Sequence, residues 1–223
     1  MKSRQEIKAL AKAAMKEQRG TAILLLFVYS LVASVLVGLD VAVILMSGGQ
    51  GLAYWVVYWI GMAILYVMAV NYAGEFIKIY KKEDASVGAM FSGFSINFAR
   101  KLGGMLWMTL WLFLWSLLLV IPGIIKALAY FFAPYILADC PGVSATEALK
   151  ISMRITKGYK MDIFVFSLTW IGWLLLSGLT FGILYIVYVG PYMETSYSGL
   201  YLEMKNKALA EGRITHEELG ISR

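Results

Sequence analysis

Apolar residues gather in blocks along this chain, and the segments between the blocks are of two kinds. Each block is close to the 20 residues or so that a helix needs to cross roughly 30 Å of hydrocarbon. Three intervening segments are short and rich in Gly, Ser, Pro and Thr, whereas the others are longer and charged. The pattern predicts membrane-spanning helices at about residues 21–46, 52–74, 102–121, 124–138, 161–178 and 183–203.

The short segments, at about 46–52, 121–124 and 178–183, would fold consecutive spans back on one another. We therefore expect an all-α fold, a polytopic membrane helical bundle of six transmembrane helices in three hairpins. Residues 1–208 would form this single membrane domain, and 209–223 a polar cytoplasmic tail. A soluble protein with buried helices is the alternative. The hydrophobic share of 60%, against about 45–50% in soluble domains, argues against it.

The basic residues fall on one side of the predicted spans. They precede the first span, lie between the second and third and between the fourth and fifth, and follow the sixth, with Lys126 as the exception. The positive-inside rule places this side, and with it both termini, in the cytoplasm. Orientation and contact with anionic headgroups then explain the net charge of +6 without a nucleic-acid partner.

Three charged segments have the pattern of amphipathic helices on the cytoplasmic side. Two open with a capping box, Ser3 with Glu6 and Ser144 with Glu147, and the third lies at about 85–101. We expect them at the membrane interface, with the basic side chains in the headgroups; these are Lys8, Lys12, Lys16, Lys150, Arg154 and Lys157. Packing of the same apolar faces against the ends of the bundle is the alternative.

The C-terminal half carries a signature of its own. The stretch YILADCPGVSATEALKISMRITKGYKMDIFVFSLTWIGWLLLSGLTFGI lies between IPGIIKALAY and VGPYMETSYSGLY. It resembles an uncharacterised bacterial membrane family, domain of unknown function 975, and is more distantly similar to membrane domains found beside glycerophosphodiesterases. The resemblance implies a six-span protein of the bacterial cytoplasmic (inner) membrane, and it implies no activity, substrate or catalytic residue.

Two charges near the outer ends of the spans are candidates for a site. Lys126 lies three residues after Gly123, about 4–5 Å below the predicted turn. Asp40 lies at a comparable depth in the first span, so the two could pair. The alternative is that the lysine side chain extends back to water at the rim of the turn.

Glu194 lies deeper, about 18 Å into the sixth span when counted from Gly182 on an ideal helix. An ionised carboxylate at that depth is costly and usually faces the bundle interior or a wet cavity. Pro191 before it and Pro134 in the fourth span predict two interrupted helices, a pattern found at transport sites. A structural role, with Glu194 hydrogen-bonded to Tyr192, Thr195 or Ser196, is the alternative.

Tryptophans recur every four residues on two spans: Trp107, Trp111 and Trp115 on the third, and Trp55 with Trp59 on the second. Packing or lipid contact is the usual reason for such a row. An aromatic groove for an amphiphile is the functional interpretation.

The chemistry of the chain narrows the function. A single cysteine and a single histidine exclude a metal site built from several of these residues and a Ser-His-Asp triad, and no P-loop or H-E-x-x-H motif occurs. We expect a non-catalytic membrane protein without cofactor or metal that binds or moves a lipid or membrane-active peptide, with Lys126 and Glu194 as its charged contacts. A structural, accessory or immunity-type membrane protein acting through protein partners is the alternative.

Overall fold

The computed structural model describes residues 2–48 and 51–220, and this part of the chain consists of helices, turns and short connections. The α-helices are α1 (Arg4–Glu17), α2 (Arg19–Ser47), α3 (Leu52–Lys81), α4 (Val87–Phe91), α5 (Phe98–Leu118), α6 (Val120–Tyr130), α7 (Ala133–Asp139), α8 (Ala145–Thr156), α9 (Lys160–Leu168), α10 (Ile171–Leu179) and α11 (Gly190–Ala210). A 3-10 helix, η1 (Ser92–Phe94), follows α4, and a π-helix, η2 (Tyr185–Val189), leads into α11. The prediction of an all-helical chain is confirmed for these residues.

Five stretches of the described chain are long and apolar enough to cross a membrane, judged by length and composition: Arg19–Met46, Leu52–Lys81, Phe98–Leu118, Val120–Asp139 and Lys160–Leu179. They coincide with the first five predicted spans. The predicted sixth span, 183–203, is not among them. Polar residues recur along its second part, and Thr195, Ser196 and Ser198 are completely buried by protein.

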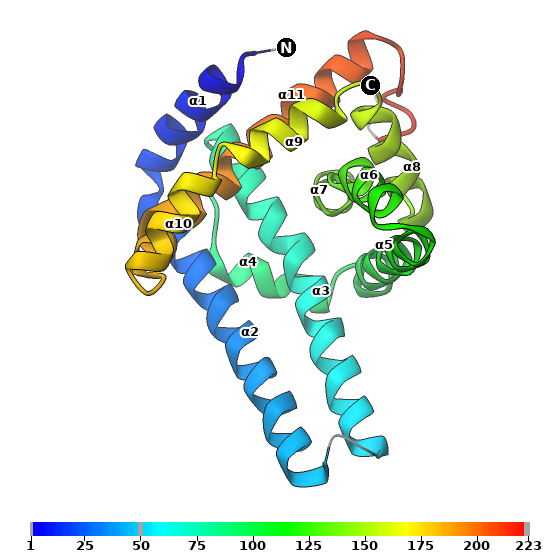
Figure 1. Ribbon diagram of the computed structural model, residues 1–223. Coiled ribbons are helices and arrows are strands. Elements are labelled where there is room, and N and C mark those ends of the chain that lie inside the picture. The colour runs from blue at the N-terminus through cyan, green and yellow to red at the C-terminus, as the bar shows by residue number, and fades with distance from the viewer. Residues whose placement is uncertain (1, 49–50, 221–223) are drawn as a thin grey trace.

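Consecutive long helices pack on one another in pairs: α2 on α3, α5 on α6, and α10 on η2. Figure 1 shows α2 and α3 side by side down to a shared end, whereas α5 and α6 are seen nearly along their axes. The two pairs therefore run in different directions and do not form a bundle of parallel helices. Large apolar side chains are exposed near the end of each pair; examples are Met46, Leu52, Leu118, Val120, Leu179 and Phe181.

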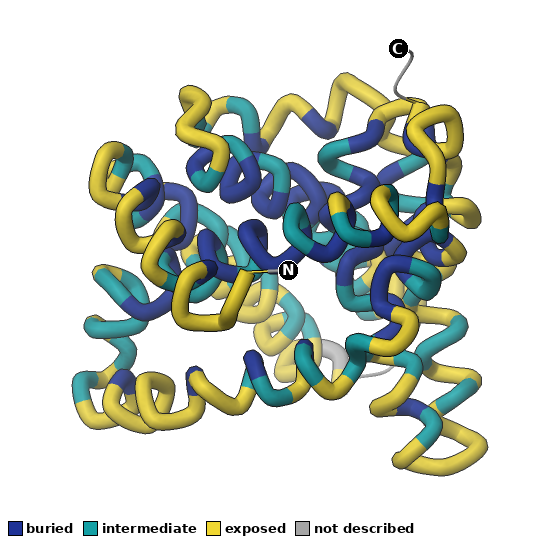
Figure 2. The backbone as a smooth tube through the Cα atoms, turned by 90° about the horizontal axis from the view of Figure 1, so that it is seen from above, coloured by how far each residue is buried: buried dark blue, intermediate teal, exposed yellow. Residues whose placement is uncertain are grey.

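The core lies where the pairs converge, around α11. This helix packs against α1, α3 and α8, and it contributes Leu200, Tyr201 and Met204 to the largest buried cluster. In the view of Figure 2 the buried residues gather toward the middle and exposed ones dominate the periphery. The second part of the predicted sixth span thus lies in a central helix that is largely covered by protein.

Both predicted capping boxes are present. Ser3 Oγ accepts from the Glu6 N–H at 3.2 Å, and Ser144 Oγ accepts from the Glu147 N–H at 3.3 Å. The apolar faces of α1 and α8 are buried against protein: α1 packs on α11 and α3, and α8 on α5 and α7. This is the packing that the sequence offered as the alternative to a helix lying on the membrane.

The turn between α5 and α6 lies earlier than the sequence predicts. The helices are separated at Leu119, whose backbone is extended, so Pro122 falls in the first turn of α6. Proline is tolerated there because the N–H groups of a first helical turn have no partner within the helix. A Cβ on Gly123 would stand 2.9 Å from Ser116 Oγ, so the glycine lets α6 approach α5 closely.

The fourth span is interrupted just before Pro134, as its position predicts. Helix α6 ends at Tyr130 and α7 begins at Ala133. Ser152 of α8 joins the broken ends, because its hydroxyl accepts from the Phe132 N–H at 3.2 Å and donates to the Ala129 carbonyl at 2.9 Å. The backbone groups left without helical partners at this break are therefore hydrogen-bonded by a neighbouring helix.

Candidate functional site

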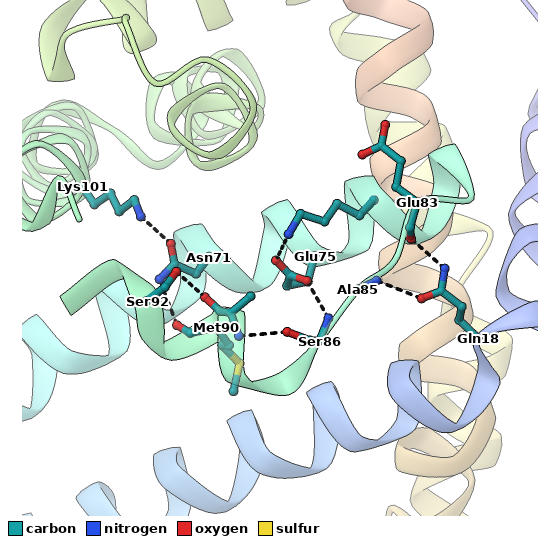
Figure 3. A network of polar contacts seen from close by, with 11 residues as sticks. Gln18, Asn71, Glu75, Glu83, Ala85, Ser86, Met90, Ser92 and Lys101 are labelled. Atoms are coloured by element: carbon teal, nitrogen blue, oxygen red, sulfur yellow. Dashed lines mark hydrogen bonds and ion pairs between the residues drawn. The ribbon is translucent and has the colours of Figure 1, made fainter. Parts of the chain in front are cut away.

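A polar cavity of about 320 Å³ lies between α3, α5, α7 and the segment formed by α4 and η1. Asn71 stands at its inner wall, where its side chain donates to the Met90 carbonyl at 2.9 Å and accepts from Lys101 Nζ at 2.6 Å (Figure 3). Asn71 and Lys101 are each only 8% exposed. One amide thus joins the short segment, α3 and α5.

Two side chains, one directly before α2 and one in α3, hydrogen-bond to the backbone of the segment that closes this cavity (Figure 3). Gln18 donates to the Glu83 carbonyl at 2.7 Å and accepts from the Ala85 N–H at 3.0 Å. Glu75 accepts from the Ser86 N–H at 2.8 Å. The segment 83–94 is therefore held in place through its backbone.

Three carboxylates line the cavity: Glu75 and Asp139 have cationic partners, whereas Glu83 forms no ion pair among the described residues. Glu75 pairs with Lys78 at 2.7 Å. Asp139 pairs with Lys81 at 3.0 Å and also accepts from Lys205, and the Tyr201 hydroxyl donates to it at 3.1 Å. Glu75 and Asp139 are therefore neutralised within the protein.

Two neighbouring cations at the cavity have no carboxylate partner among the described residues. Lys101 Nζ is bonded to the neutral amide of Asn71. Arg100 donates to three backbone carbonyls around the end of α7, those of Leu137, Cys140 and Val143, and its Nε is buried without a partner. The cavity therefore holds two cations that form no ion pair among the described residues, against one unpaired carboxylate, that of Glu83.

An apolar groove of about 920 Å³ lies between α3 and α5. Aromatic rings dominate its walls, and the lining residues are Tyr54, Trp55, Tyr58, Trp59, Met62, Tyr66, Gly103, Leu106, Trp107, Thr109, Leu110 and Phe113. The Tyr66 hydroxyl and Thr109 Oγ1 are 2.9 Å apart and bridge the two helices within it. Trp55, Trp59 and Phe113 are more than half exposed, so the groove opens on the surface of the molecule.

The groove and the polar cavity follow one another along the seam between α3 and α5. On α5, Lys101 lines the cavity and Gly103 lines the groove, a rise of about 3 Å along the helix. On α3, Asn71 and Tyr66 are separated by about 7.5 Å. The charged cavity and the apolar groove thus lie at successive levels of the same two helices, an order that matches the headgroup and the chain of an amphiphile.

Lys126 does not pair with Asp40. Its Nζ lies 4.5 Å from the ring centroid of Trp115 and 5.8 Å from that of Tyr130. Asp40 forms no ion pair among the described residues, and its Oδ1 is buried without a hydrogen-bond partner. Because α6 begins at Val120, Lys126 is about 9 Å along that helix, and its side chain reaches Trp115 on the neighbouring α5.

Glu194 lies in α11, is half-buried and forms no ion pair among the described residues. Thr195 and Ser196 do not bond to it, since their hydroxyls donate to the carbonyls of Pro191 and Tyr192 on their own helix. Lys126 lies over the rings of Trp115 and Tyr130, and no ion pair or hydrogen bond among the described residues joins the two predicted charges.

Pro191 lies in the first turn of α11, directly after the π-helix. A Cβ on the preceding Gly190 would overlap Leu26 of α2, which shows how closely this bend approaches the first span. The backbone stays helical through this region, so the irregularity before Pro191 is a π-helical segment rather than the predicted interruption, and it lies where α11 approaches α2 closely.

The three tryptophans predicted to form a row on α5 do not share the same surroundings. Trp107 lines the groove together with Trp55 and Trp59 of α3. Trp111 meets Trp107 edge-on, with ring centroids 5.8 Å apart, and packs against a cluster of Tyr130, Ala133 and Leu149. The aromatic groove that the sequence suggested is present, but Trp111 and Trp115 do not line it.

The basic residues predicted to lie at the membrane interface differ in exposure and in their contacts. Lys12, Lys16, Lys150 and Lys157 are exposed, and Arg154 pairs with Glu218 at 2.8 Å. Lys8 turns inward, donating to Thr169 Oγ1 at 2.6 Å with its Nζ 3.8 Å from the Trp170 ring centroid. Burial accordingly lowers the pKa of Lys8.

The polar cavity was missed in the sequence because its residues lie at the ends of predicted spans, where polar side chains are common. A signal was nonetheless present. Asn71 and Glu75 are four residues apart in a helix and so share one face, and Arg100 and Lys101 begin the next span. Nothing in this spacing showed that the segment 83–94 folds back over them.

The chain matches no curated protein and no solved structure. A family model described as "Protein of unknown function (DUF975)" matches residues 116–208, from the end of α5 to the last turns of α11. Residues 116–208 are therefore shown to resemble this family, as the signature in the C-terminal half predicts.

Proposed function

We propose that this chain is a non-catalytic membrane protein that binds an amphiphile in the seam between α3 and α5. One observation carries the proposal: the apolar groove of about 920 Å³ and a polar cavity follow one another along the same two helices. Ligand pockets are commonly about 300–1,000 Å³ and lined by aromatic residues with a few polar groups. The seam has these properties, and its open side lies on helices that are apolar enough to lie in a membrane.

The membrane arrangement that we propose has six spans in three hairpins, with both termini in the cytoplasm. The exposed apolar side chains at the ends of the three helix pairs support it, as does the sidedness of the basic residues. Because the pairs diverge, they would cross with tilt. Labelling of single cysteines in a Cys140→Ser background tests this: Gly48→Cys should react only with external reagent and Glu83→Cys only after permeabilisation.

The proposed function places the ligand on α3 and α5 rather than among the fourth to sixth spans. Lys126 lies over aromatic rings of α5 and α6, and Glu194 lies in the central helix α11. Neither lines the groove or the polar cavity. We therefore assign both residues to the packing of the membrane domain.

Native mass spectrometry of the protein released from detergent tests the proposal. The wild type should carry an amphiphile adduct, and Trp107→Ala should lose at least about 90% of it, the effect of removing roughly 1.4 kcal/mol of contact. Trp173→Ala is the matched control: Trp173 is 39% exposed against 37% for Trp107, and each has one close aromatic neighbour.

An adduct that survives Trp107→Ala and is lost in Trp173→Ala would move the site to another surface. Bare protein in all three samples, after incubation with lipid mixtures, would contradict amphiphile binding. A co-purifying protein chain that persists in both variants would instead support the accessory role expected as the alternative.

A further inference from the structure

The polar cavity identifies the chemical class of the amphiphile, an inference that rests on the proposed function. Four cationic side chains line the cavity, namely Lys78, Lys81, Arg100 and Lys101. Lys78 is held by Glu75, and Lys81 by Asp139. The cations without an ion pair are therefore Arg100 and Lys101, and one unpaired carboxylate, that of Glu83, lines the cavity beside them.

Lys101 is almost covered by protein, and its ammonium group has hydrogen-bond donors that no protein group accepts. Its ammonium group carries three N–H donors, and one hydrogen bond, to Asn71, is formed with protein. The residue is 8% exposed. A buried ammonium without a counter-charge is costly, so an anion entering the cavity would be strongly favoured.

Arg100 adds a second cation from the next position of α5. Its terminal nitrogens donate to the carbonyls at the end of α7 and its Nε is buried, so Arg100 contributes its positive charge rather than a free donor. Lysine binds phosphate as a compact point charge, and a phosphate beside Lys101 would also be attracted by the neighbouring Arg100.

The position of the cations fits a headgroup attached to acyl chains. Gly103, about 3 Å farther along α5 than Lys101, already belongs to the apolar groove. We propose that the ligand is a phosphate-bearing lipid, with its phosphate at Lys101 and Arg100 and its acyl chain in the groove among Trp55, Trp59 and Trp107.

Binding of lipids that differ only in the headgroup tests this assignment in detergent-solubilised full-length protein. The probes are dioleoyl phosphatidic acid, dioleoyl phosphatidylglycerol and dioleoylglycerol, which has the same acyl chains but no phosphate, with glycerol 3-phosphate as the soluble source of the phosphate. The wild type should bind the two anionic lipids about tenfold more tightly than dioleoylglycerol, because charged hydrogen bonds contribute roughly 1.4 kcal/mol or more.

Lys101→Gln should abolish this preference and leave dioleoylglycerol binding unchanged, whereas Lys101→Arg should keep part of it. Lys12→Gln, which removes one exposed charge from α1, controls for net charge and should retain the preference. Should Lys101→Gln fail to fold, Glu83→Gln provides the second variant, since it removes an exposed carboxylate that lines the cavity, and it should strengthen anionic lipid binding selectively.

The possible results separate the two proposals. Equal binding of all three lipids, abolished by Trp107→Ala, would overturn the phosphate assignment and leave the amphiphile site intact. Binding of glycerol 3-phosphate as tight as that of the anionic lipids would overturn the lipid source. No lipid binding to the wild type would overturn the proposed function itself.

Discussion

Two lysines in different regions of the molecule, Lys126 on α6 and Lys101 on α5, have opposite surroundings. At the end of the α5–α6 pair, Lys126 is partly exposed and lies over the rings of Trp115 and Tyr130. At the start of α5, Lys101 is buried and bonded to one neutral amide beside a cavity. The first is the lysine that interrupts an apolar run, yet the second has the surroundings of a binding site. A charged side chain indicates a binding site when some of its hydrogen-bonding groups have no protein partner. An apolar sequence around the charge is a weaker indication.

Removing the amide partner of Lys101 should have the largest effect on stability. Asn71→Leu would leave the buried ammonium without its protein partner, and we expect the free energy of unfolding to fall by about 2–3 kcal/mol. Chemical denaturation in detergent measures this. Adding Lys101→Met to Asn71→Leu should recover part of the loss, because the double variant no longer buries an unpaired charge. A loss below about 0.5 kcal/mol for Asn71→Leu would show that the ammonium does not depend on the amide.

A smaller effect is expected from the segment that covers the cavity. A Cβ on Gly93 would overlap the Asn71 amide, so Gly93→Ala should push that side chain away from Lys101 and cost about 1–3 kcal/mol. Gly88→Ala is the matched control in the same segment, since no atom lies within 4 Å of its Cβ position. The control should be neutral or slightly stabilising. Equal thermal midpoints for the two variants would contradict the close contact between Gly93 and Asn71.

The smallest effect should come from the exposed lysine. Lys126→Met removes cation–π contacts near the surface, and we expect a loss below about 1 kcal/mol with unchanged lipid binding. The same denaturation and lipid-binding assays measure both quantities. A loss of lipid binding in Lys126→Met with normal binding in Lys101→Gln would reverse the comparison and place the site at the end of the α5–α6 pair.

Much of the local structure could be predicted because it depends on nearby residues. The five apolar helices follow from block length, and the capping boxes of α1 and α8 follow from Ser and Glu at fixed spacing. The interruption before Pro134 follows from the missing N–H of proline. The turn between α5 and α6 was placed at Pro122-Gly123, but the chain turns at Leu119, because proline is acceptable in a first helical turn.

The candidate site was less predictable because contacts distant in the sequence create it. Asn71 and Lys101 are 30 positions apart and meet only because α3 and α5 pack together. The pairing of Asp40 with Lys126 was suggested by equal depth alone, and the helix pairs diverge in the structure. The row of tryptophans gave a correct hint of an aromatic groove, yet spacing could not tell that Trp107 faces it and Trp115 faces Lys126.

The position of a bound lipid tests the central claim most directly. Dioleoyl phosphatidic acid carrying a photoreactive diazirine on one acyl chain would be cross-linked to the full-length protein, and the labelled peptides identified by mass spectrometry. We predict labelling concentrated in residues 54–66 and 103–113, competed by unlabelled phosphatidic acid and reduced in Lys101→Gln. Labelling spread evenly over the exposed apolar ends of the helix pairs, without competition, would contradict a specific amphiphile site between α3 and α5.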